Sequence, residues 1–196
     1  MNTKCRWALW GALFIPCIGW AQPQKGDFTL GGSISTSHRG SWDSSIGTRD
    51  FRAVLAPQAG VFVNDHLRLG GVLNASFSHS RWNEGQEGFQ SRGISIGPEV
   101  AYYFGEKRWT PFVFGAIQLR WYQNIRLQNG VETESTNRNS FTQLGGGIAY
   151  WVAPKVALQA SVNYAAYGPL IPTSFGVQFL SSRIGVLFIW NRSDSE

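Results

Sequence analysis

Cysteine is scarce in this chain, and so is charge. There are two cysteines among the 196 residues, Cys5 and Cys17, and both precede Gln22. If a leader is removed before that residue, the remaining chain forms neither a disulfide nor a thiolate metal site. Charged residues make up 15% of the sequence, and no run of like charges stands out. A nucleic-acid partner is therefore not expected.

Long apolar segments are also missing. The apolar run over 7–20 is short for a membrane-spanning helix, follows a basic start, and ends in small residues at positions −3 and −1 before Gln22. These features predict a cleaved signal peptide over residues 1–21. A retained anchor helix is the alternative. A lipoprotein signal at Cys17 is disfavoured because no small residue directly precedes the cysteine.

The expected mature domain, residues 22–196, has the length of one domain. Two of the 17 Lys and Arg residues lie in the leader, so 15 remain against 12 Asp and Glu, a net charge of about +3. Aromatic residues make up 14% of the chain, and there are 23 glycines. This composition fits a barrel, because a barrel distributes its hydrophobicity over alternate positions.

Apolar side chains alternate with small or polar ones in eight stretches after residue 26. In residues 93–104 the even positions are apolar, whereas the odd positions hold four small residues, Glu99 and Tyr103. The even set should face lipid and the odd set a narrow interior, because eight strands leave little internal room. The predicted strands span residues 27–37, 51–63, 67–82, 91–104, 109–122, 140–152, 155–164 and 175–190.

The gaps between these strands alternate short and long. The short gaps are 64–66, 105–108 and 153–155, and the long ones run from about 37 to 50, 82 to 91, 122 to 139 and 165 to 174. The pattern predicts an all-β fold: an eight-stranded antiparallel up-and-down transmembrane β-barrel with short periplasmic turns and longer extracellular loops. The polar segment 122–140 is expected to be a mobile surface loop.

Aromatic residues gather near the ends of the predicted strands, as interface girdles require. The expected periplasmic girdle contains Tyr102, Phe104, Trp109, Tyr150, Phe188 and Trp190, and the outer one contains Phe77, Trp121 and Tyr164. A soluble lipocalin-like barrel also has eight antiparallel strands. Its aromatic residues would not be expected to concentrate at the two ends of the strands.

Three segments carry a resemblance to a known family. In 57–65, 97–104 and 110–116, a proline-containing strand runs into aromatic residues, and the first two lead into a tight polar turn. In this the chain resembles the OmpA/OmpX-type outer-membrane barrel domains. The resemblance implies the outer membrane of a Gram-negative bacterium, contact with its lipids, and folding by the barrel-assembly machinery. Such barrels often end on an aromatic residue, whereas six residues follow Trp190 here.

A catalytic constellation is not found. Outer-membrane lipid A deacylases of this size need a His and a Ser on one lipid-facing side, hence at i and i+2. His79 has Arg81 at that position. No nucleophile elbow, paired-carboxylate site or metal-spaced histidine cluster occurs. The chain is therefore expected to be no enzyme and to need no cofactor, with lipid A modification as the lesser alternative. The glycines of 145–147 should admit close packing.

Parity predicts a polar interior. A carboxylate inside so narrow a bore needs a partner. Counting residues from the short-turn end brings Glu99 and Arg183 to similar heights, so an ion pair between them is expected to block the lumen. The predicted inward-facing polar residues are Gln58, Asn74, Glu99, Gln118, Arg120, Gln143, Gln159, Asn163 and Arg183.

An outward-facing basic group is predicted at the outer rim. If Trp82 pairs with Ser91, then Arg81 lies opposite Arg92, on the same face as His79. Opposed like charges are unfavourable, and a lipopolysaccharide phosphate would reconcile them. The alternative is that both arginines are simply hydrated beyond the membrane.

Two function classes follow. The first is a structural or interaction barrel with a plugged lumen, and the second is a narrow channel or carrier for small or hydrophobic solutes. The sequence does not identify a partner for the extracellular loops.

Overall fold

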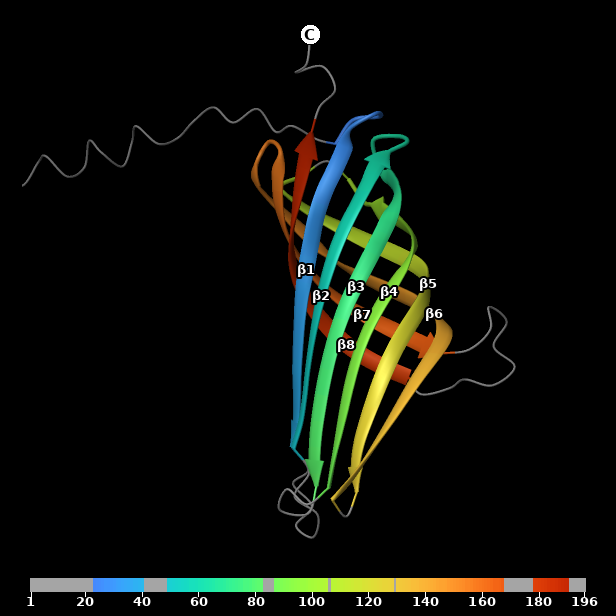
Figure 1. Ribbon diagram of the computed structural model, residues 1–196. Helices are drawn as coiled ribbons and strands as arrows, with labels where there is room; N and C mark the ends of the chain where they lie inside the picture. The colour runs from blue at the N-terminus through green and yellow to red at the C-terminus, as the bar shows by residue number, and fades with distance from the viewer. Residues whose placement is uncertain are drawn as a thin grey trace, which may run out of the picture.

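The computed structural model is a closed barrel in which each strand pairs with its neighbours in the chain, and the last pairs with the first (Figure 1). It describes residues 23–40, 49–82, 87–105, 107–128, 130–167 and 178–190. The strands are β1 (Phe28–Gly40), β2 (Arg49–Phe62), β3 (Leu67–Trp82), β4 (Glu87–Tyr103), β5 (Trp109–Gln128), β6 (Val131–Ala153), β7 (Val156–Tyr167) and β8 (Gln178–Trp190).

Every strand pair is antiparallel, and the barrel closes between β1 and β8 over Phe28–Ile34 and Ile184–Trp190. Closure removes the sheet edges, so backbone hydrogen bonds are satisfied within the wall. The predicted eight-stranded up-and-down barrel is thereby confirmed. In the part of the chain that the structure describes, no helix is long and apolar enough to cross a membrane.

The short connections are gathered at one end of the barrel, where β8 also ends (Figure 1). They join β2 to β3, β4 to β5 and β6 to β7, as the sequence predicts. In the first of these turns Asn64 Oδ1 accepts hydrogen bonds from the backbone amides of His66 and Leu67, at 2.9 and 2.7 Å. The predicted signal peptide, the tail after Trp190, and residues 41–48, 83–86 and 168–177 lie outside the described residues.

The polar segment 122–140, expected to be a loop, is instead a regular hairpin. β5 and β6 continue pairing from Trp109 opposite Tyr150 to Gln128 opposite Val131. A two-residue turn closes it, and Gly130 has a φ of +77°, as tight hairpin turns require. β5 and β6 are therefore the longest strands, with 20 and 23 residues.

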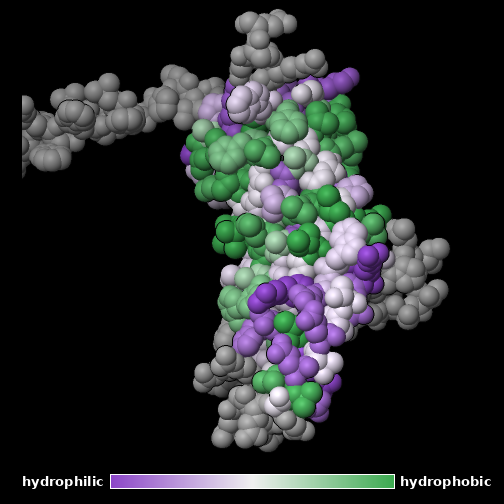
Figure 2. All heavy atoms as spheres, in the orientation of Figure 1, coloured by the Kyte–Doolittle hydropathy of each residue, from purple (hydrophilic) through white to green (hydrophobic). Residues whose placement is uncertain are grey.

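Apolar side chains cover the outside of the barrel. Figure 2 shows them gathered toward the end with the short connections, with hydrophilic residues toward the opposite end. The girdle residues Trp109 and Trp190 are 62% and 74% exposed, and Trp109 packs on Tyr150 at 4.3 Å between ring centroids. Exposed large apolar residues include Leu30, Ile34, Leu55, Leu73, Ile94, Ile96, Leu119, Leu144, Val162 and Ile184. A closed barrel with this outer surface is built to span a membrane.

Candidate functional site: the barrel lumen

The lumen begins with an apolar layer next to the short connections. We call its buried residues the floor: Phe62, Ala101, Tyr103, Phe112, Phe114, Ala149, Trp151, Ala157, Leu187 and Ile189. Their rings form a chain across the barrel, with centroids 5.4 Å apart from Phe62 to Tyr103 and again from Tyr103 to Phe112. Sequence reasoning placed Tyr103 inside but missed the other large side chains. Their inward parity was the signal that could have revealed the floor.

Glycines make room for these rings. Gly145 and Gly147 lie directly opposite Phe114 and Phe112 in the β5–β6 register. A Cβ at Gly145 would lie 2.6 Å from the Phe114 ring, and one at Gly147 would lie 2.1 Å from the carbonyl oxygen of Ala160. The glycine run therefore serves close packing, as the sequence predicts.

Above the floor lies an ion pair between Glu99 and Arg68, whose side chains are 6% and 3% exposed. The Arg68 Nη2 also donates to Gln58 Oε1 at 3.2 Å. The sequence predicted Arg183 as the partner of Glu99, and this was wrong. Arg183 attracts Glu99 electrostatically without forming a salt bridge. Arg68 reaches Glu99 because it enters from the end of β3, beside the floor.

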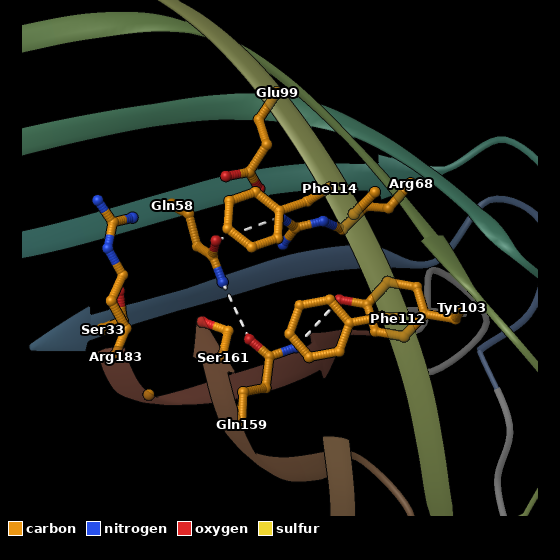
Figure 3. Close-up of a pocket in the computed structure, with 12 residues that line it drawn as sticks. Ser33, Gln58, Arg68, Glu99, Tyr103, Phe112, Phe114, Gln159, Ser161 and Arg183 are labelled. Atoms are coloured by element: carbon orange, nitrogen blue, oxygen red, sulfur yellow. Dashed lines mark hydrogen bonds and ion pairs between the residues drawn. The ribbon is translucent and has the colours of Figure 1, made fainter. Parts of the chain in front are cut away.

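Two amides connect this pair to the floor. Gln58 Nε2 donates to Gln159 Oε1 at 3.4 Å, and Gln159 Nε2 donates to the Tyr103 hydroxyl oxygen at 3.0 Å. Figure 3 shows these groups surrounding one cavity, together with the guanidinium of Arg183. We call Gln58, Arg68, Glu99 and Gln159 the ion-pair layer.

A second polar layer lies further from the floor, and we call it the amide layer: Asn74, Ser95, Gln118 and Gln143. Gln118 Oε1 accepts from Asn74 Nδ2 and, at 2.8 Å, from Ser95 Oγ. Gln118 Nε2 and Arg183 Nη2 both donate to Gln143 Oε1, each at 3.3 Å. Gln118 and Gln143 are almost completely buried. Arg183 thus contacts the amide layer rather than neutralising Glu99.

The remaining predicted lumen residues lie toward the outer mouth. Arg120 Nη2 donates to Ser76 Oγ at 3.4 Å, and its guanidinium carbon lies 4.9 Å from the centre of the Tyr122 ring. Asn163 Nδ2 donates to Ser181 Oγ at 2.8 Å. These contacts join β3 to β5 and β7 to β8.

The basic group predicted on the outer face has a different register. Arg81 lies opposite Gly88 and Arg49, whereas Arg92 lies opposite Phe77 and Gln123. The proposed Arg81–Arg92 opposition is therefore wrong, because β3 and β4 continue pairing to Trp82 and Glu87. Arg92 is exposed and His79 half-buried. The side chain of Arg81 lies outside the described residues.

Comparison with known proteins is decisive only for structure. No protein-family profile matches the chain, and no curated protein matches it in sequence. The N-terminal barrel domain of Pseudomonas aeruginosa OprF superposes with a TM-score of 0.54 at 13% identity, covering 85% of this chain and 98% of that one. The chain has the fold of the small eight-stranded outer-membrane barrels.

Two further barrels of this fold support the assignment. Ail of Yersinia pestis, crystallised with the heparin analogue sucrose octasulfate, gives a TM-score of 0.52 at 10% identity and covers 85% of this chain and 100% of its own. Neisserial surface protein A gives 0.50 at 20% identity, covering 84% and 97%. All three likenesses are at 20% identity or below, and they establish the fold.

Proposed function

We propose that this chain is a structural or interaction protein of the bacterial surface, with no enzymatic activity, and that its barrel does not conduct ions freely. The observation that carries the proposal is the filled lumen: the floor, the ion-pair layer and the amide layer follow one another along the bore. An eight-stranded barrel is barely wide enough for its own side chains. A solute would have to displace buried, hydrogen-bonded groups at each level.

The outer end offers the surface for contact. The β5–β6 hairpin carries polar side chains on both faces over Thr133–Arg138, and Gln123 Nε2 donates to Glu134 Oε1 on its exposed side. Paired strands present side chains in a fixed arrangement, as a binding surface requires. This hairpin is the best candidate for the site at which a partner docks.

The biogenesis that fits this proposal is export to a Gram-negative outer membrane through a signal peptide cleaved before Gln22, followed by folding on the barrel-assembly machinery. N-terminal sequencing of membrane material should begin at Gln22. Lipopolysaccharide is the lipid expected around the outer girdle. Arg92 is exposed and lies opposite Phe77 in register, and its guanidinium is suited to binding a lipid phosphate there.

Planar-bilayer recording tests the non-conducting barrel. The wild type should give no steady ohmic conductance, because the floor and both polar layers close the bore. The variant Phe112→Ala combined with Phe114→Ala opens the floor alone and should also stay closed, because both polar layers remain in the bore; heat-modifiable gel mobility checks that it folds. Steady wild-type conductance that Glu99→Gln leaves unchanged would replace this proposal with the narrow-channel alternative.

A further inference from the structure

A cavity of about 30 Å³ lies between the floor and the amide layer. Figure 3 shows the side chains around it, and the lining residues come from seven strands, all except β6. The polar groups on its wall include the guanidiniums of Arg68 and Arg183, the hydroxyls of Ser33 and Ser161, and the carboxylate of Glu99. The volume is enough for about two water molecules or one small ion.

Positive charge exceeds negative charge around this cavity. Arg68 and Arg183 face a single carboxylate, Glu99, which is already committed to Arg68. A buried charge without a counter-charge is costly, so the arrangement favours an anion beside Arg183.

Hydrogen-bond donors are also in excess. Arg68 Nε, Arg68 Nη1 and Arg183 Nε are buried and have no partner within the protein. The two amide carbonyls on the cavity wall already accept hydrogen bonds, Gln58 Oε1 from Arg68 and Gln159 Oε1 from Gln58. Arg68 itself is only 2% exposed. A ligand that pairs with these arginine donors must accept several hydrogen bonds at once.

We propose that the cavity is a binding site for one small monovalent anion, of the size of chloride, held between Arg68 and Arg183. A chloride ion accepts hydrogen bonds from all sides and supplies the missing negative charge. The cavity is too small for a phosphate or sulfate with its own hydration. The site goes beyond the proposed surface function, since it neutralises the closed lumen from within and does not depend on what the hairpin binds.

The experiment compares the unfolding midpoint of the purified barrel in sodium chloride, sodium bromide and sodium gluconate at equal ionic strength. A ligand that binds only the folded state stabilises it, and the stabilisation grows with the ligand concentration. The halides should raise the midpoint above the gluconate value by about 2 to 4 °C, the shift expected for modest binding to a chain of this size. Crystals grown in bromide should show an anomalous peak in the cavity.

Arg183→Gln should abolish the difference between halide and gluconate. Arg120→Gln is the matched control, because Arg120 points into the same lumen but does not line the cavity, and it should keep the full difference. If Arg183→Gln does not fold, Ser161→Val tests the site by narrowing it. Equal midpoints for the wild type in all three salts, with no bromide peak, would overturn the proposal and leave water in the cavity.

Discussion

The two ends of the lumen are filled by different kinds of side chain, apolar at the floor and polar beyond it. The floor is packed like the core of a soluble protein, with aromatic rings in contact and Phe62 fully buried. The layers beyond it are polar, and their side chains are bonded to one another from strand to strand. A narrow barrel is therefore closed either by ring packing or by mutual hydrogen bonding. The two ways of closing it should lose different amounts of unfolding free energy when one group is removed.

The largest effect should come from breaking the buried ion pair. Glu99→Gln leaves the Arg68 charge without its partner, so the free energy of unfolding should fall by about 3 to 5 kcal/mol. Urea-dependent folding into lipid vesicles measures this loss. The double variant Glu99→Gln with Arg68→Gln removes both charges and should recover most of it. Equal losses in the single and double variants would mean that the unpaired charge of Arg68 is not the cause of the lost stability.

A slightly smaller loss is expected from the floor. Phe62→Ala removes a fully buried ring, and the cavity left behind should cost about 3 kcal/mol in the same assay. Phe28→Ala is the matched control, because Phe28 faces outward and is 49% exposed. It should cost clearly less. If the two variants lost the same free energy, the floor would not be packed like a core.

Parity explains why so much of the lumen could be predicted from sequence. Side chains alternate across a strand, so Gln118 and Gln143 had to point to the same side as Glu99 once lipid-facing residues were recognised. The alternation carries no information on which inward residues touch, because that depends on the stagger between strands. Counting from strand ends therefore chose Arg183 for Glu99 and overlooked Arg68.

The hairpin was missed for a different reason. Over Glu132–Arg138 both faces are polar, so the apolar alternation that predicts strands is absent from the second half of the hairpin. The signal that could have found it was Asn129-Gly130, a dipeptide typical of two-residue hairpin turns. β3 was predicted with its observed bounds, but β4 begins at Glu87 rather than at the predicted residue 91, and this difference gave Arg81 and Arg92 the wrong register. Local turn chemistry, rather than hydrophobicity, marked the end of the β5–β6 hairpin.

A substitution in the amide layer should lower the free energy of unfolding less than one in the ion-pair layer or the floor. Gln118→Leu keeps the volume but removes the acceptor of Asn74 and Ser95 and the donor to Gln143. Leaving neutral polar groups buried and unpaired should cost about 1 to 3 kcal/mol. Gln123→Leu, on the exposed face of the same strand, should change the unfolding free energy much less. A cost above that of Glu99→Gln would show that the amides, not the ion pair, dominate the polar layers.

The smallest effect is expected at the outer edge, where water can replace a lost partner. Ser181→Ala removes the acceptor of the 2.8 Å hydrogen bond from Asn163, but Ser181 is only half-buried. The loss should be about 0.5 to 1.5 kcal/mol, the net contribution of one hydrogen bond. Ser182→Ala is an adjacent control on the outward face, where alanine removes a polar group from an exposed position. The vesicle-folding assay should find no loss for it. If Ser181→Ala cost as much as Gln118→Leu, the polar lumen would be uniformly closed to water up to its mouth rather than progressively hydrated.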